Sequence, residues 1–148
     1  MVQTATILQD SLFFVKNFLL TNLTDPIASS RPSTEKFIMT SYPQRPVRYP
    51  LITVKDMNSY SIMRSGFQST ITQHYVEIEV RIWARDIKEK DNLADAIFQK
   101  LKDNQFTSST GQTANFLHDF QLMSSVNVDE VDGPKSKVMT FKFLFVAT

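Results

Sequence analysis

Two short segments of the chain carry side chains that could do chemistry. His118 and Asp119 could act as a base and the acid that orients it, but adjacent residues of a regular strand point to opposite faces. No serine lies in the Gly-flanked turn that exposes a nucleophile. Asp129, Glu130 and Asp132 could offer oxygen ligands to a hard cation, yet the EF-hand pattern is absent. A surface strand and a solvated hairpin turn are the simpler explanations, and we favour them.

The remaining acidic pair and the residue counts also argue against an enzyme. Glu77 and Glu79 share one face of a predicted strand, as two catalytic carboxylates could, but Arg81 follows on that face and favours an ion-paired surface. The chain has no Cys, which excludes disulfides, thiolate metal sites and a Cys nucleophile. Its two His cannot alone form a three-ligand zinc site, and its three Gly are too scattered for a phosphate-binding loop. We expect no catalytic, cofactor-binding or metal site, and a binding or assembly role instead.

The composition is that of one globular domain. The chain has 148 residues, of which 42% are hydrophobic and 21% charged, and its formal net charge is +1. A dedicated nucleic-acid binder usually has a clear basic excess, so this class is disfavoured. No apolar stretch approaches the ~20 residues that span a membrane, and residues 1–10 lack the basic side chains of a signal peptide. We expect a single domain over residues 1–148, soluble in the cytoplasm where it is made.

Hydrophobic periodicity predicts an α+β fold. The clearest signal is a period of two between Gln68 and Arg85, where Val76, Ile78 and Val80 alternate with charged and aromatic residues. The predicted order is a helix over 4–23, strands over 36–40, 51–55 and 68–85, a helix over 88–103, and strands over 116–131 and 137–146. We therefore expect a mainly antiparallel sheet, with the N-terminal helix and the second helix packed on it.

The N-terminal helix has a wider apolar arc than one packing face needs. Most of its apolar residues fall within half of the circumference, but Phe13 and Leu20 lie on the opposite side among polar residues. A lone domain would leave these two side chains partly exposed. They either form a second layer of the same core or contact a neighbouring subunit, and we predict the subunit contact.

A proline-rich arm covers about residues 24–50 and holds five of the six prolines. Within it, prolines restrict the backbone of residues 41–50, which lowers the entropy lost on docking. Tyr42 and Tyr49 offer rigid apolar area, and Arg45 and Arg48 can bind carboxylates. The segment is either an ordinary surface loop or an interface, and we predict that it lies against an adjacent subunit or another partner rather than on its own sheet.

Charge is unevenly distributed along the chain. Residues 31–64 carry six basic side chains against two acidic ones, a net of +4, and residues 86–135 carry nine acidic against five basic, a net of −4. A solvated surface would account for this distribution. Opposed patches would also fix the register of a ring in which one face of a subunit meets a different face of the next.

Two motifs and the order of elements resemble the tail terminator family of tailed viruses, also called tail-completion or tail-to-head joining proteins. One motif is Arg48-Tyr49-Pro50-Leu51-Ile52-Thr53-Val54, similar to the family's aromatic–Pro–apolar strand after a Pro-rich stretch. The other is Val80-Arg81-Ile82-Trp83-Ala84 followed by Asn92-Leu93-Ala94-Asp95-Ala96-Ile97, similar to its strand, Trp–Ala, polar gap and helix. With the N-terminal helix and the Phe-rich last strand, the resemblance covers most of the chain.

The resemblance implies a tail-terminator-like fold and a structural, non-enzymatic role in the virion. Such proteins form a homo-oligomeric ring, typically a hexamer, that caps the tail tube and joins it to the head-completion or connector protein. DNA passes through the lumen without sequence readout. The expected location is the tail or neck of the virion, after assembly in the host cytoplasm, with no membrane partner.

Other functions stay open at this point. Related neck and tail-tube proteins have similar shapes. Tyr75 and Trp83 share one strand face and could stack the bases of a single-stranded nucleic acid or hold a small ligand, although no run of basic and aromatic residues accompanies them. We include both residues among the predicted interface residues. An enzyme whose motif we do not identify is the remaining alternative.

Overall fold

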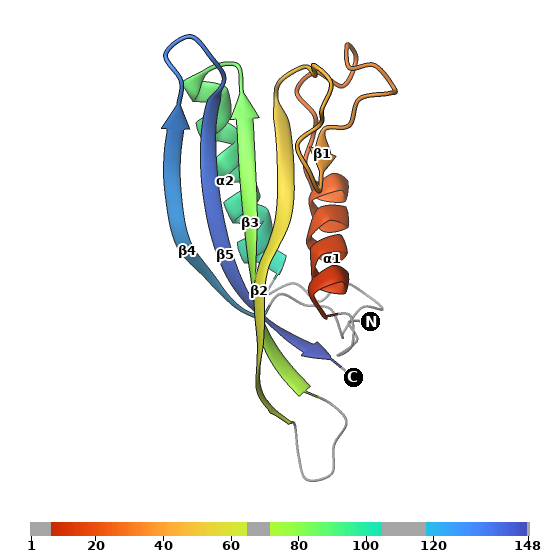
Figure 1. The fold of residues 1–148 in the computed structure, drawn as a ribbon, viewed down its shortest axis with the longest axis vertical. Helices are drawn as coiled ribbons and strands as arrows, with labels where there is room; N and C mark the ends of the chain where they lie inside the picture. Colours follow the sequence, from red (N-terminus) through yellow and green to blue (C-terminus); the bar gives the residue numbers. More distant parts are fainter. Residues whose placement is uncertain (1–6, 65–71, 105–117, 148) are drawn as a thin grey trace.

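The computed structural model describes residues 7–64, 72–104 and 118–147 of the chain (Figure 1). Two helices and five strands follow one another as α1 (Ile7–Asn22), β1 (Ile38–Met39), β2 (Leu51–Arg64), β3 (Thr72–Ala84), α2 (Ile87–Asn104), β4 (His118–Asp129) and β5 (Lys135–Ala147). Each predicted helix and strand has a counterpart within a few residues of its expected bounds, except at one end of β2. Residues 1–6, 65–71 and 105–117, on which parts of three predicted elements fall, lie outside the described residues.

The strands form one sheet in the order β1-β2-β3-β5-β4. β1 pairs with β2 in parallel through two residue pairs, and the pairs β2–β3, β3–β5 and β5–β4 are antiparallel. The predicted α+β class with a mainly antiparallel sheet and two helices is confirmed. β4 lies at one edge of the sheet, and β1 with the adjoining α1 lies at the other (Figure 1).

One face of the sheet carries the core. Every second residue of β3 is buried there because the strand alternates strictly, and in register with it Phe141 and Phe143 of β5 are fully buried. Val15 and Leu19 of α1 and Leu101 of α2 cover this face. The two helices therefore pack on the same side of the sheet. In Figure 1, α2 lies behind the strands and α1 stands beside β2.

The second helix begins where its sequence provides a cap. The Asp86 carboxylate accepts a hydrogen bond from the Glu89 amide at 2.8 Å, and the Asp86 carbonyl accepts one from the Lys90 amide at 3.1 Å. An Asp before the first helical residue satisfies one of the free N–H groups at the helix end. β3 therefore passes into α2 through the short turn Arg85–Asp86.

The prediction for the strand at residues 51–55 is too short. β2 continues to Arg64 and pairs with β3 along its whole length. Its alternation is interrupted by register shifts between Asp56 and Asn58 and between Ser61 and Met63. A register shift places an extra residue in one strand, so the period of two that identifies a strand in a sequence is lost there.

Candidate interaction surface

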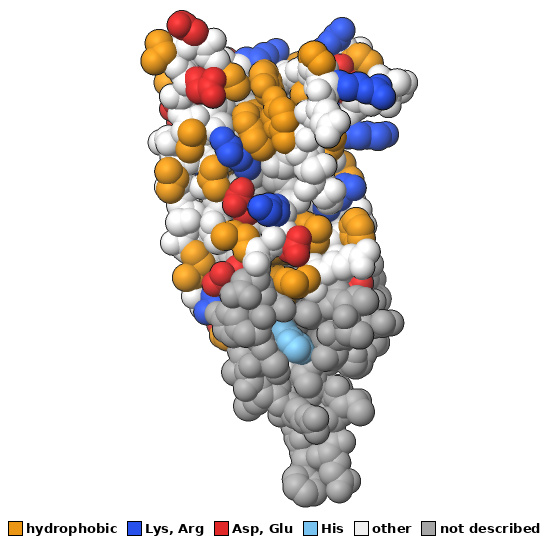
Figure 2. Space-filling model, in the orientation of Figure 1, with side chains coloured by type: hydrophobic (Ala, Val, Ile, Leu, Met, Phe, Trp, Pro, Cys, Tyr) orange, Lys and Arg blue, Asp and Glu red, His pale blue; other side chains and the backbone are white. Residues whose placement is uncertain are grey.

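Neither of the two described helices lies on the second face of the sheet, and Figure 2 shows this open face. The register of the strands fixes which side chains lie side by side on this face. Glu79 of β3 lies between Lys55 of β2 and Thr140 of β5, and Glu77 lies opposite Lys142. The Glu77, Glu79 and Arg81 face that the sequence indicated therefore has cationic side chains in register with its carboxylates. In Figure 2 red and blue side chains meet in the middle of this face.

An aromatic cluster lies at the end of the open face where β3 leads into α2. The ring of Tyr42, from the arm, packs against the Trp83 ring at 4.9 Å between centroids, and the Arg81 guanidinium lies 4.7 Å from the centre of the Trp83 ring. The hydroxyls of Tyr42 and Tyr49 are hydrogen-bonded at 2.8 Å. The arm thus rests on its own sheet at Tyr42, and the expectation that it lies elsewhere is wrong at this point.

Burial beneath the arm explains that contact. Leu51 points to the open face in register with Trp83, yet it is fully buried and stands apart from the main core, and Pro50 before it is buried as well. Because burial of a Leu side chain contributes ~1.5–3 kcal/mol, the arm gains stability by folding back over this residue. Burial also raises the pKa of Tyr49 to about 12, helped by the Tyr42 hydroxyl and by the negative charge of Glu130.

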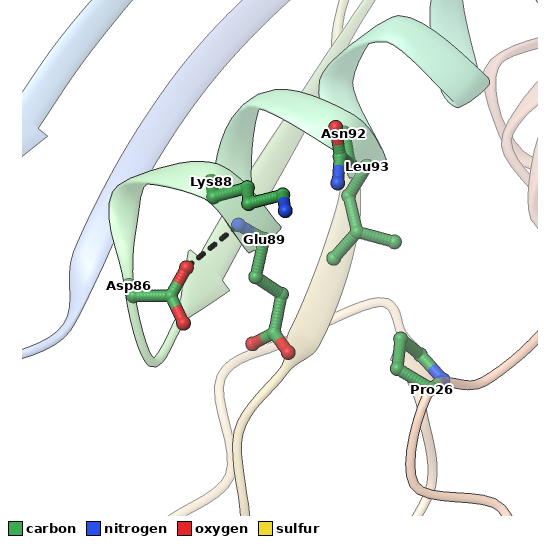
Figure 3. Close-up of a pocket in the computed structure, with 6 residues that line it drawn as sticks. All are labelled: Pro26, Asp86, Lys88, Glu89, Asn92 and Leu93. Carbon is green, nitrogen blue, oxygen red and sulfur yellow. Dashed lines mark hydrogen bonds between the residues drawn. The ribbon is translucent and has the colours of Figure 1, made fainter.

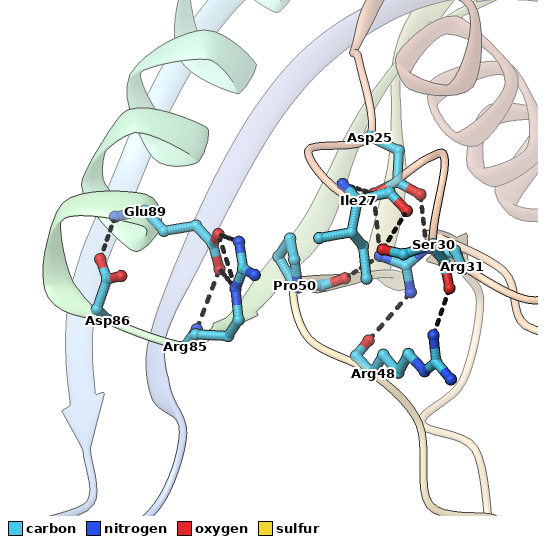
Figure 4. A network of polar contacts seen from close by, with 9 residues as sticks. All are labelled: Asp25, Ile27, Ser30, Arg31, Arg48, Pro50, Arg85, Asp86 and Glu89. Atoms are coloured by element: carbon cyan, nitrogen blue, oxygen red, sulfur yellow. Dashed lines mark hydrogen bonds and ion pairs between the residues drawn. The ribbon is translucent and has the colours of Figure 1, made fainter.

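Arg31 fixes the course of the arm (Figure 4). Only 5% of its side chain is exposed, and its guanidinium donates hydrogen bonds to Asp25 (Nε–Oδ2 2.5 Å, Nη2–Oδ1 3.0 Å), to the Arg48 carbonyl at 3.0 Å and to the Pro50 carbonyl at 2.6 Å. It also lies 5.4 Å from the centre of the Phe37 ring. One side chain therefore joins the two ends of the segment between α1 and β2.

Asp25 is the anionic partner in this network. Its carboxylate also accepts a hydrogen bond from the Ile27 amide at 3.1 Å. Burial alone would raise the pKa of Asp25, but the hydrogen bonds from Arg31 and Ile27 and the charge of Arg31 lower it below its usual value. In the sequence Arg31 stands out only as a basic residue, because two of its partners are backbone carbonyls 17 and 19 residues away, and this role was not predicted.

The two predicted arm arginines differ in their surroundings. Arg48 is exposed, but its guanidinium donates to the Ser30 carbonyl and its amide donates to the Glu35 carboxylate at 3.2 Å. Arg45 is exposed at the outer part of the arm. Arg45 and Arg48 were predicted to bind carboxylates of a partner, and this stays a prediction.

Phe13 and Leu20 lie on the outer side of α1, as the helical period indicated. Their side chains are 43% and 46% exposed, whereas Val15 and Leu19 of the same helix are fully buried. The expectation that a single copy leaves both partly exposed is confirmed. The predicted subunit contact at these residues stays a prediction.

Tyr75 lies on the open face far from the aromatic cluster. Its ring is 4.4 Å from the Lys142 ammonium, and its hydroxyl donates to the Asp119 carboxylate. Asp119 has a φ of 48°, and the β4–β5 register shifts between His118 and Gln121, so this stretch is not the regular strand that the sequence analysis assumed. The Asp119 carboxylate is used in a structural contact, and the His118 side chain lies outside the described residues.

The acidic residues at the end of β4 are largely engaged with nearby lysines. Lys90 of α2 is 99% buried, and its ammonium bonds both carboxylate oxygens of Asp129 at 2.9 Å. This hydrogen bond lowers the pKa of Asp129. Lys135 donates to the Glu130 carbonyl, and the Glu130 and Asp132 side chains stay exposed.

Within residues 7–64, 72–104 and 118–147 no three His, Asp or Glu side chains gather as a metal site would need.

One open pocket of about 300 Å³ lies between Pro26 and the start of α2 (Figure 3). Its lining also includes Asp86, Lys88, Glu89 and Asn92. The carboxylate of Asp86 caps the helix, and that of Glu89 is paired with the Arg85 guanidinium (Figure 4). The acidic groups of the pocket are therefore already committed to local contacts.

The position of β4 at the edge of the sheet is a feature that the sequence did not predict. All of its residues from Gln121 to Asp129 are exposed, including Leu122, Met123, Val126 and Val128, and Val131 beyond it is 92% exposed. Its apolar residues predicted a strand, but the pattern could not show that the strand is at an edge. Lys90, buried beneath the end of β4, was likewise counted only as a charge.

No family model matches the chain, and no curated protein matches it in sequence. Among the described helices, neither is long and apolar enough to cross a membrane. Support for a function therefore comes from the residues and geometry of the chain itself.

Proposed function

We propose that the chain is a structural virion protein of a tailed virus, with a tail-terminator-like fold. In this role a homo-oligomeric ring, a hexamer in the form the resemblance implies, caps the tail tube and joins it to the head-completion or connector protein. DNA passes through the lumen without sequence-specific contact, and the ring belongs to the tail or neck of the virion.

The observation that carries this proposal is apolar surface on two opposite sides of one sheet. Phe13 and Leu20 are exposed on α1, beside the β1–β2 edge, and Val126 and Val128 are exposed at the β4 edge. Two different apolar sides on one chain suit heterologous contacts, which close into a ring when the rotation between subunits allows it. The order of helices and strands agrees with the order that the resemblance rests on.

The alternative of a single-stranded nucleic-acid or ligand module finds less support. Base stacking needs a free aromatic face. Trp83 is in contact with Tyr42 and Arg81, and Tyr75 is in contact with Lys142, so both rings have partners within the chain. A related neck or tail-tube protein of the same virion class would share the surface described here and is the second candidate.

Mass in solution and shape test the proposal together. Sedimentation velocity of the purified chain should show a discrete oligomer, and negative-stain microscopy should show rings with a central hole. A chain that stays monomeric across the accessible concentrations would reject the ring, and rings that fail to bind purified tail tubes would reject tail capping.

Two variants connect the ring to the exposed residues of α1. Phe13→Asp or Leu20→Asp should dissociate the ring, because either change places a charge in an apolar contact. Gln99→Asp, at an exposed position of α2, is the matched control and should leave the ring intact. Circular dichroism and the urea midpoint should stay unchanged for all three, and unfolding of the Phe13 variant would assign Phe13 to the core of its own subunit instead.

A further inference from the structure

β4 has register shifts before Ser124, but from Ser124 to Val128 it lacks the features that normally protect an edge strand from pairing. Natural edge strands carry Lys, Pro, inward-pointing charges or β-bulges, or they are very short. β4 is 12 residues long, and from Gln121 to Val128 it has neither a charged residue nor a proline. Its apolar side chains are exposed on both faces of the strand, among them Val126 at 54%. Such an edge favours association, and the question is which surface covers it.

Charge identifies that surface. The β4–β5 turn presents the exposed carboxylates Glu130 and Asp132 next to the exposed apolar residues of β4, Leu122, Met123, Val126 and Val128, which we call the β4 strip. The arm lies at the same end of the sheet, near enough for Glu130 to act on Tyr49, but on the side of β1 and β2, and it presents the exposed cations Lys36, Arg45 and Arg48. In Figure 2 red side chains gather at the upper left, over the β4–β5 end, and blue ones at the right, over the α1 and arm side. The two sides are therefore opposite in charge.

We propose that the β4 edge of one copy packs against the arm of the next copy, with Glu130 and Asp132 of the first beside Arg45 and Arg48 of the second. This inference rests on the proposed ring, and it specifies the lateral contact. Pro46 and the part of Tyr42 that stays exposed beside Trp83 supply apolar area for the β4 strip, and the prolines limit the entropy that docking removes. Because the two surfaces differ, the contact repeats head to tail and propagates around a ring.

An isologous pairing of two β4 strands is the competing geometry. It would cover the apolar strip but leave the cations of the arm without the carboxylates of another copy. The arm remains available for the head-to-tail contact because its inner side is already fixed on the sheet by Tyr42 and Arg31, and Arg45 lies exposed on it.

The absence of cysteine makes a cross-linking test direct. Gln44→Cys places a thiol at an exposed arm position, and Val131→Cys places one beside the β4 strip, without removing a charge. A short bismaleimide should join the two variants when they are mixed, and it should join neither variant to itself. Gln99→Cys is the control for random collision. Cross-linking of Val131→Cys to itself alone would establish the isologous pairing and overturn the inference.

Charge reversal gives a second measurement on the oligomer. Arg45→Glu and Glu130→Arg should each weaken association by about tenfold or more, since each places like charges together, and the double variant should recover most of the loss. Lys100→Glu on α2 makes the same charge change elsewhere and should have no such effect. Rings that are insensitive to all these changes would overturn the arm contact and leave the ring itself in place. A wild-type monomer would instead reject the proposed ring, and this contact with it.

Discussion

The two faces of the sheet use the same strands but are held in different ways. On the helix-covered face, apolar side chains from every other element form one buried core, and β4 adds the partly buried Phe120, whose ring packs on Phe141 and Phe143. On the open face, the arm covers one end, where Leu51 of β2 is buried and Tyr42 of the arm packs on Trp83 of β3. The rest of this face presents rows of charged side chains to solvent. The core face therefore holds most of the buried apolar side chains of the domain, whereas the open face away from the arm and the edge at β4 face solvent.

The largest expected effect separates the two faces directly. Phe141→Ala on the core face should lower the free energy of unfolding by about 3–5 kcal/mol, because a fully buried ring leaves a cavity in a close-packed core. Ser124→Ala, on β4 in register with Thr140 of the open face, should change it by less than about 0.5 kcal/mol. Urea denaturation followed by circular dichroism measures both, and equal losses would show that the open face is part of the core.

A smaller effect is expected at the residue that holds the arm. Arg31→Met should cost about 2–4 kcal/mol, because it removes hydrogen bonds to two carbonyls and leaves Asp25 without its guanidinium. The exposed Arg45→Met is the matched control and should be near neutral. Hydrogen exchange should rise at residues 41–49 in the first variant alone. An arm that stays protected without Arg31 would show that Leu51 and Tyr42 hold it unaided.

The helices and strands whose apolar residues recur with an unbroken period were predicted from the sequence. β3 and α2 have uninterrupted periods of two and of 3.6, so their positions follow from the order of apolar residues. β2 was underestimated because the register shifts after Asp56 break its alternation. The exposure of Phe13 and Leu20 was also predictable, because the fixed angular period of a helix places them opposite the buried residues of α1.

The open face was harder to predict because its contacts are between residues far apart in sequence. Tyr42 meets Trp83 across 41 positions, and Arg31 bonds backbone carbonyls, which carry no sequence signal. The exposure of Val126 and Val128 follows from β4 being the last strand of the sheet, a property of topology rather than of composition. The aromatic and cationic residues of the arm could be named from the sequence, but their arrangement on the sheet could not.

Acid should weaken the arm before it weakens the core. The pKa of Asp25 is lowered in the folded chain, so the folded state binds protons less readily than the unfolded state. The stabilisation from Asp25 is therefore complete above its ordinary pKa of 3.8 and is lost as the pH falls through the lower, folded value. Asp25→Asn should be less stable than the wild type at pH 7 and should approach it near pH 2, as measured by thermal unfolding. A constant difference between the two proteins at all pH values would contradict the ion pair.

The smallest effect is expected at the hydroxyl pair that closes the aromatic cluster. The pKa of Tyr49 is raised to about 12 by burial first and then by Tyr42, so the folded chain keeps this proton where the unfolded chain has lost it. The resulting stability is complete below pH 10 and declines as the pH rises from 10 to about 12.

Tyr42→Phe removes the hydroxyl and keeps the ring on Trp83, so the pKa of Tyr49 should fall part of the way toward 10 while burial still holds it above that value. The loss of stability near pH 7 should be about 0.5–1.5 kcal/mol, the usual contribution of one hydrogen bond. NMR of tyrosines labelled at the ring carbon that bears oxygen gives one signal for each of the four tyrosines, and the signal missing in Tyr49→Phe is that of Tyr49. An unchanged titration in Tyr42→Phe would show that the two hydroxyls do not interact, and the cluster would then depend on ring packing only.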